Sequence, residues 1–207
     1  MDLVTLRALA EGTAYAASAA AANAIDAYIL DGEALFMRWN GYSGADSAMN
    51  WDVACKGREI SRAPVGLIPV NTGPYAPALR AASSSPRKEE LRQLADRMQG
   101  NGTHLIASRH FWRSDTAVHH REAFASSVHM CSTRTYASEY VNGENSQAWL
   151  MGAGVNFFYR NGTEYSGIFP VWDWRHLPGV TSRNNTTYSL GEVGHVQLEW
   201  RRTRAGI

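Results

Sequence analysis

Two arginines, Arg58 and Arg62, stand four residues apart in the stretch "CKGREISRAPVG". On a helix or in a tight turn this spacing aims two guanidinium groups in the same direction, which suits a carboxylate and the oxygens beside it. The spacing alone fits better with a solvated helix face on which Glu59 is an ion-pair partner. The stretch is therefore a candidate anion site, with a surface ion pair as the alternative.

Two adjacent histidines, His119 and His120, lie in "SDTAVHHREAF" and are followed by Arg121. A histidine titrates near neutral pH, so a general base is conceivable here. In a strand the two rings would point to opposite faces of the sheet, which rules out a metal site built from both on one face. We interpret both as structural histidines and keep the general base as the alternative.

Polar residues gather in "YASEYVNGENSQAW", where Glu139, Asn142, Glu144 and Asn145 occur within seven positions. Carboxylates and amides could orient an arginine or bind sugar hydroxyls. A hairpin turn collects the same residue types for conformational reasons. The motif alone does not separate a binding site from a turn.

Seven tryptophans occur in this chain of 207 residues, several beside polar residues as in "VWDWRHLPG". An indole face covers the C–H surface of a sugar ring, so tryptophans beside polar groups are typical of carbohydrate sites. Most tryptophans in proteins nevertheless pack in the core. We expect one or two of the seven to contact a ligand.

The composition excludes several function classes. With 20 basic and 19 acidic residues, the chain has no global field that would attract nucleic acid or a membrane. No segment approaches the roughly 20 apolar residues that span a bilayer. Cys55 and Cys131 lie far apart and match no metal spacing, so we predict buried, unbridged thiols.

The chain changes character near residue 100. Residues 1–98 are predicted to be mainly helical and residues 102–207 mainly β, with a short joint at 99–102. "ASSSPRKEELRQLADRM" is a clear helix start, with Ser83 to Ser85 as possible caps. The predicted apolar helical positions are Leu3, Leu6, Leu9 and Ala10, then Ile25, Tyr28, Ile29 and Leu35, then Leu91, Leu94 and Met98.

The second half shows strand signals. "THLIASRHFW", "FASSVHMCSTRTYAS", "VNFFYRNGTEYSG" and "HVQLEWRR" are rich in β-branched and aromatic residues and partly alternate. Asn-Gly pairs at 142–143 and 161–162 are typical of hairpin turns. The predicted class is α+β, with helices first and an antiparallel sheet second.

Taken in order, "GREISR", "HHR", "STRTYASEYVNGEN" and "FPVWDWRHLPGVTSR" resemble polysaccharide lyase family 8, the hyaluronate, chondroitin AC and xanthan lyases. The last block is most similar to the chondroitin AC lyases. The resemblance implies the C-terminal part of an incomplete (α/α) toroid, followed by the start of an antiparallel β-sandwich domain, with a substrate cleft between them.

The resemblance also implies a function. Enzymes of this family cleave uronic-acid-containing glycosaminoglycans such as chondroitin or hyaluronan by β-elimination, without a metal or other cofactor. The expected partner is an anionic polysaccharide, with no nucleic acid and no membrane, and the full-length form is expected to be a monomer. A secreted protein is expected, since the substrates are extracellular and Asn-X-Ser/Thr sequons begin at Asn101, Asn161, Asn184 and Asn185.

Matched residue by residue, the resemblance assigns the family's arginine pair to Arg58 and Arg62. It assigns the cleft-facing glutamate and asparagine to Glu139, which would brace an arginine, and Asn142, which would bind substrate. Trp149 would pack behind this turn. The implied catalytic residues are thus Arg58, Arg62 and Glu139.

One departure from the family pattern bears on activity. The family's asparagine, histidine and tyrosine lie on helices before the arginine pair, and Tyr15, Tyr28 and Tyr42 have no matching context. We therefore expect an internal piece of a lyase that is inactive alone. The alternative is a catalytically silent, uronan-binding remnant that lacks the histidine and tyrosine.

Overall fold

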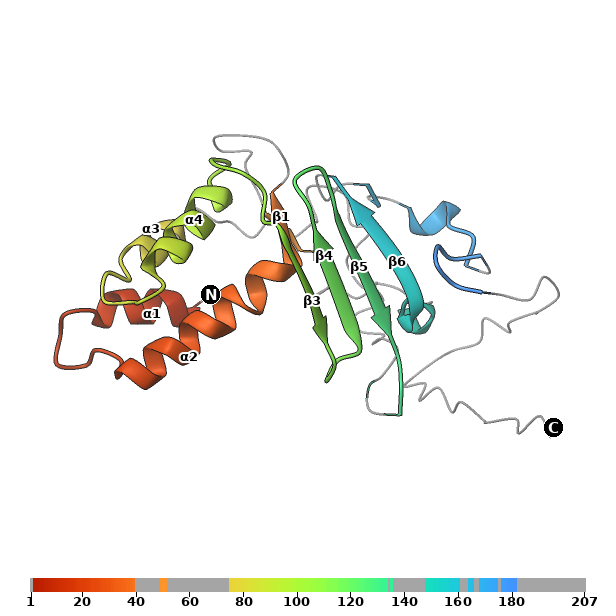
Figure 1. Ribbon diagram of the computed structural model, residues 1–207. Coiled ribbons are helices and arrows are strands. Elements are labelled where there is room, and N and C mark those ends of the chain that lie inside the picture. The colour runs from red at the N-terminus through yellow and green to blue at the C-terminus, as the bar shows by residue number, and fades with distance from the viewer. Residues whose placement is uncertain are drawn as a thin grey trace.

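A computed structural model describes residues 2–39, 49–51, 75–133, 135, 148–160, 164–165, 168–174 and 176–181. Helices gather on one side, and a four-stranded antiparallel sheet of order β3-β4-β5-β6 lies on the other (Figure 1). The helical elements are α1 (Asp2–Ala10), α2 (Ala19–Leu30), η1 (Glu33–Phe36), α3 (Tyr75–Arg80), α4 (Lys88–Met98), η3 (Ala148–Gly152) and η4 (Phe169–Val171). The strands are β1 (Met37–Trp39), β2 (Met49–Trp51), β3 (Ala107–Phe111), β4 (Thr116–His120), β5 (Ala125–Met130) and β6 (Ala153–Tyr159). The predicted α+β class is confirmed.

The helix predicted from "KEELRQLADRM" is present as α4. Its buried side chains are those at helical spacing: Leu91, Leu94, Ala95 and Met98. The predicted serine cap works indirectly, because the N-cap residue is Arg87 and its main-chain N–H donates to Ser85 Oγ at 2.9 Å. Two acidic residues in the first turn, Glu89 and Glu90, complement the helix dipole.

The predicted apolar stripe on α1 is wrong. Leu3, Leu6 and Leu9 are 49%, 63% and 74% exposed, and α1 instead turns Val4 and Arg7 toward the core. Burial of Arg7 fixes the rotation of the helix, and the three leucines lie on the other side as a consequence. A periodic pattern identifies a helix but not the side chain that decides which face is buried.

The apolar pattern around Tyr28 and Leu35 does not form one helix. α2 ends at Leu30, and Tyr28 is 60% exposed. Gly32 follows, where a Cβ would lie 2.6 Å from the carbonyl oxygen of Tyr28, so only glycine fits this turn. Leu35 then lies in η1 and packs on Val118 of the sheet. The chain continues into β1, so the first half also contributes the antiparallel β1–β2 pair.

A buried polar cluster sets the relative positions of α1, α2 and the turn before α4. Asp26 is 0% exposed, and its Oδ1 accepts a hydrogen bond from Arg7 Nη1. Its Oδ2 accepts from Ser85 Oγ at 2.6 Å. A buried charge must be paired to be tolerated, so these three residues hold the helices in one arrangement.

The four-stranded sheet buries one face. Along β4 and β5 the buried residues alternate with partly buried ones, and they are Thr116, Val118, His120, Ala125, Ser127 and His129. His119 and His120 therefore point to opposite faces, as the strand prediction requires. At the β6 edge, Phe157 and Tyr159 pack with Tyr165, Trp172 and Trp174, so the latter two tryptophans are core residues.

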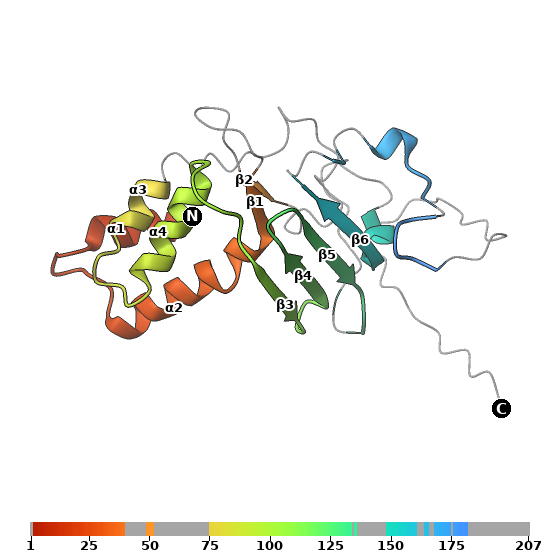
Figure 2. The ribbon, with the colours of Figure 1, turned by 45° about the horizontal axis from the view of Figure 1, so that its top comes forward.

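Arg38 in β1 joins the helical part to the sheet. It is 4% exposed and donates to three carbonyl oxygens: Arg160 O at 2.7 Å, Glu122 O at 2.8 Å and Arg121 O at 3.2 Å. These carbonyls belong to the β4–β5 turn and to the end of β6. Burial lowers the pKa of the Arg38 guanidinium, opposed by the charges of Glu122 and Glu164. Figure 2 shows β1 between the helices and the sheet.

His120 strengthens the same joint. Its Nε2–H donates to the carbonyl oxygen of Leu35 at 2.8 Å, which ties β4 to η1. Burial lowers the pKa of His120, and the positive charge of Arg38 adds to this effect. Burial and the charge of Arg38 also lower the pKa of nearby His104. Phe36 and Phe111 complete the contact, with ring centroids 4.8 Å apart.

Replacing Asp26 by alanine should lower the free energy of unfolding by about 3–5 kcal/mol, because Arg7 is left as an unpaired buried charge. Asp96→Ala is the control, since Asp96 pairs with Arg80 and Arg92 at the solvent side of α4 and surface pairs are worth below about 1 kcal/mol. Urea unfolding followed by far-ultraviolet circular dichroism gives both values. Equal losses in the two variants would contradict the account.

Acidification should destabilise the protein from about pH 6.5 downward. The pKa values of His104 and His120 are lowered in the folded state, so the unfolded chain, with histidine near pKa 6.5, binds more protons below that pH. His120→Gln keeps a donor for Leu35 O and should make the loss between about pH 7 and 5 shallower. His110→Gln, at an exposed position of β3, should not. An unchanged slope in His120→Gln would count against the account.

Candidate functional site

The segment that carries Arg58 and Arg62 connects β2 to α3, and both residues lie outside the described residues. At its start, Trp51 of β2 pairs with Met37, the neighbour of Arg38. At its end, Tyr75 begins α3, which packs in the helical core. The described residues that flank this segment thus lie in the β1–β2 pair and in the helical core.

Glu139 and Asn142 lie in the segment 136–147, which is also outside the described residues. The residue before it is well fixed, because Thr135 Oγ1 donates to Asp115 Oδ2 at 3.1 Å. Asp115 is buried and has a positive φ of 48° in the β3–β4 turn. The segment therefore starts beside this turn and leads to η3, the helical turn before β6.

Trp149 lies within η3, and its side chain is not among those that the structure describes. Of the two cysteines, Cys131 is a free thiol, as predicted, but its burial is intermediate, whereas a buried thiol was predicted. Cys55 lies outside the described residues.

The two histidines have structural partners on opposite faces. His120 bonds to Leu35 O, and the ring of His119 lies 6.1 Å from that of Phe124. The structural interpretation is confirmed for His120, which is buried at the joint. Across the described ranges, no group of three or more histidine, cysteine, aspartate or glutamate side chains is arranged to hold a metal ion.

A small pocket lies at the joint. Its volume is about 240 Å³ including space open to solvent, below the roughly 300–1,000 Å³ of usual ligand sites. Its lining comprises Ala34, Met37, Arg38, Arg97, His104, Leu105 and His120. All ionisable groups among these are basic, and burial lowers the pKa of Arg97 against the opposing charge of Asp96. The pocket suits water or a very small anion rather than a sugar ring.

The β3–β4 turn presents an exposed indole. Trp112 is 57% exposed, and the Arg113 guanidinium carbon lies 5.1 Å from its ring centroid. Trp172 and Trp174, by contrast, pack in the aromatic cluster on β6. The sequence pattern indicated only a strand in "THLIASRHFW" and assigned no role to the Trp112–Arg113 pair. The available signal was an aromatic–arginine pair directly before a Ser-Asp turn.

The structural role of Arg38 was not predicted from the sequence either. It sits in "LFMRWN", an apolar run in which a single arginine resembles a residue at a solvent-exposed position. Its carbonyl partners lie more than 80 residues further along the chain. Within the described part of the chain, no helix is long and apolar enough to cross a bilayer.

Comparison with known proteins yields a family match. The family described as "Polysaccharide lyase family 8, super-sandwich domain" matches residues 106–204, which begin at β3. Chondroitinase-AC of Pedobacter heparinus is 40% identical over 77 residues, covering 37% of this chain and 11% of that protein. Hyaluronate lyase of Thermasporomyces composti is 36% identical over 80 residues, covering 37% of this chain and 10% of that protein.

The fold likeness extends further than the matched sequence. A solved structure of chondroitinase AC lyase, from work on its complexes with oligosaccharides, matches with a TM-score of 0.68 at 25% identity. The match covers 87% of this chain and 26% of that chain, so this chain spans about a quarter of that lyase. The ordered sequence motifs, the matched residues and the shared arrangement of helices and sheet agree. Residues 106–204 of this chain match the super-sandwich domain of polysaccharide lyase family 8, and the fold of the chain is similar to that of a chondroitinase AC lyase.

Proposed function

We propose that this chain serves a carbon–oxygen lyase that cleaves uronic-acid-containing glycosaminoglycans, such as chondroitin or hyaluronan, by β-elimination. The observation that carries the proposal is the likeness to chondroitinase AC lyase across 87% of this chain, through both helices and sheet. Relatives named chondroitinase-AC and hyaluronate lyase support the same substrate class.

The helices and the sheet receive finer assignments under this proposal. α1 to α4 form the C-terminal part of an incomplete (α/α) toroid, supported by the packing of α3 on α4 and of α1 on α3. The sheet β3 to β6 begins the β-sandwich domain. The substrate then lies across the joint that Arg38 and His120 stabilise.

The reaction removes the proton on C5 of the uronic acid. The electron pair of the C–H bond forms the C4–C5 double bond, and the bond from C4 to the 4-oxygen breaks with that oxygen taking up a proton. C5 is acidic only when the charge of the adjacent carboxylate is offset. We assign this to Arg58 and Arg62, with Glu139 holding an arginine in place and Asn142 binding the sugar.

Two further properties follow from the proposal. The enzyme acts as a monomer on an anionic polysaccharide, without nucleic acid or membrane partners. It is secreted, since its substrates are extracellular. The sequon at Asn101 supports this, because that residue is exposed in the turn after α4.

The direct test is the ultraviolet absorbance of the unsaturated uronide. The complete product of the gene is incubated with chondroitin, hyaluronan and a neutral polysaccharide. Absorbance should grow with the first two and not with the third. Binding of chondroitin without any growth in absorbance would refute the lyase and favour the silent, uronan-binding alternative.

Replacing Arg62 by alanine in the active enzyme should lower kcat by about 10² to 10³, by analogy with the loss of one donor to a developing negative charge. KM should change less, because negative charge grows as C5 loses its proton and the guanidinium gains most in the transition state. Arg62→Lys should recover only part of the rate, since one ammonium cannot reproduce the planar fork. A Glu139→Gln variant should show a milder defect of the same kind.

Arg92→Ala is the matched control. Arg92 is an exposed arginine on α4 that pairs with Glu89 and Asp96, so its loss should leave kcat near normal. An Arg62→Ala enzyme with near-normal kcat and a large rise in KM would reassign the arginine pair to ground-state binding.

A further inference from the structure

Two arginines flank two aromatic residues along β3 and the turn that follows it. The Arg109 guanidinium carbon lies 5.5 Å from the ring centroid of Phe111, and that of Arg113 lies 5.1 Å from the ring of Trp112. We call Arg109, Phe111, Trp112 and Arg113 the basic–aromatic strip. Its two arginines and Trp112 are exposed, so the strip offers two cations and one open indole face to solvent.

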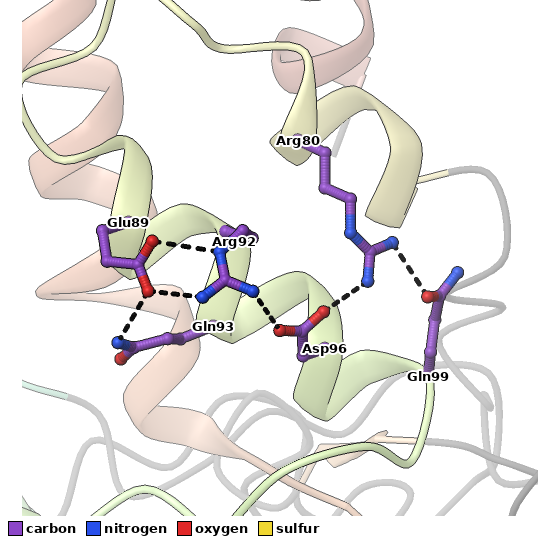
Figure 3. A network of polar contacts seen from close by, with 6 residues as sticks. All are labelled: Arg80, Glu89, Arg92, Gln93, Asp96 and Gln99. Carbon is purple, nitrogen blue, oxygen red and sulfur yellow. Dashed lines mark hydrogen bonds and ion pairs between the residues drawn. The ribbon is translucent and has the colours of Figure 1, made fainter.

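The arginines of the strip differ from those on the helices. Arg80 bonds to Asp96 at 2.5 Å and to Gln99 at 2.8 Å, and Arg92 bonds to Glu89 at 2.6 Å and to Asp96 at 3.1 Å (Figure 3). Carboxylates of the protein thus offset those charges. Among the residues that the structure describes, neither Arg109 nor Arg113 forms an ion pair. At longer range, the charge of Arg109 adds to that of Arg87 in lowering the pKa of Asp31.

The strip lies at the edge of the sheet. β3 pairs only with β4 in the described sheet (Figure 1). Ser108, Arg109 and His110 are all exposed, and Arg109 shares the sheet face of its pairing partner Val118. Five strand residues extend about 17 Å, a length that suits an extended chain rather than a single small molecule. Trp112 continues this line into the turn.

Charge argues against a second copy of the chain as the occupant. Antiparallel pairing of β3 with itself about its centre would set Arg109 against Arg109, and like charges directly opposite each other destabilise a strand pair. An anion at the turn would instead gain from Arg113, and an anion that also reaches the sheet face of Val118 would gain from Arg109. An indole stacks on the C–H face of a sugar ring, and guanidiniums form paired hydrogen bonds with carboxylates or sulfates.

We propose that the basic–aromatic strip binds an anionic polysaccharide, with Trp112 under one sugar ring and Arg113 and Arg109 at acidic groups along the chain. The turn that carries Trp112 and Arg113 also holds Asp115, which bonds to Thr135 at the start of the segment with Glu139 and Asn142. The strip therefore lies beside the residue that holds the described start of that segment. The choice of a uronic-acid polysaccharide as ligand rests on the proposed function.

The experiment measures binding of chondroitin and hyaluronan oligosaccharides by calorimetry, with a neutral glucan as the control ligand. Trp112→Ala should weaken binding about tenfold and Arg113→Gln about two- to fivefold. Arg113→Lys should fall between Arg113→Gln and the unchanged protein, since it keeps the charge and loses the stacked plane. Added salt should weaken binding less in Arg113→Gln, because one screened contact is already gone.

Arg92→Gln is the matched control, because it removes the same charge from an exposed but ion-paired site and should leave affinity unchanged. Thermal unfolding should shift little in any of these variants, since exposed substitutions usually change stability by under about 0.5 kcal/mol. Equal weakening in Arg92→Gln and Arg113→Gln would overturn the strip and indicate nonspecific charge attraction. A concentration-dependent dimer that Trp112→Ala abolishes, without loss of polysaccharide affinity, would also overturn it.

The lyase activity and the polysaccharide-binding strip can be refuted independently of each other. Weakened binding in the Trp112 and Arg113 variants of a protein that yields no unsaturated product would support the strip and refute the lyase. Normal product formation with unchanged KM in both variants would support the lyase and refute the strip.

Discussion

Burial of Arg38 is the constraint on which the two-part architecture depends. The side chain is 4% exposed, and its hydrogen bonds go to three main-chain carbonyls of the sheet. A buried guanidinium without these acceptors would be costly. β1 can therefore be buried only when the β4–β5 turn and the end of β6 are already in place. The helical part and the sheet are thereby made dependent on each other.

That dependence extends to the proposed site from both sides. Arg58 and Arg62 follow β2, the strand that pairs with β1, so the position at which their segment starts is set by the joint. Glu139 and Asn142 follow Thr135, whose hydrogen bond to Asp115 fixes the start of their segment at the β3–β4 turn. The described elements thus fix where each of the two segments starts that carry the residues assigned to catalysis by the family resemblance.

The sequence predicted those features that depend only on interactions between neighbouring residues. The apolar spacing of α4, the alternation of β4 and the opposite directions of His119 and His120 needed only neighbouring residues. The exposed leucines of α1 could not be predicted, because the partner of Arg7 is Asp26 on another helix. β1 was missed for a similar reason, since the partners of Arg38 come from the distant sheet.

The candidate site, too, could be predicted from the sequence only in part. The ordered motifs were enough to indicate the family, and the matched residues and the shared fold agree with them. The Arg58 and Arg62 spacing alone also fitted a solvated helix face, because spacing carries no information on which groups a distant segment supplies. The Trp112–Arg113 pair was not predicted, because the sequence does not show that Trp112 is exposed. Nor does it show that Arg113 stacks on Trp112 without an ion pair among the described residues.

Coupling between helices and sheet is the central claim, and Arg38→Lys tests it most directly. A lysine keeps the charge but cannot reach three carbonyls with a planar fork. The measurement compares urea unfolding followed by far-ultraviolet circular dichroism, which reports the helices, with unfolding followed by tryptophan fluorescence, to which the cluster around Trp172 and Trp174 on β6 contributes. The account predicts coincident transitions in the unchanged protein and separated transitions at lower urea in Arg38→Lys. Coincident transitions with an unchanged midpoint in Arg38→Lys would contradict it.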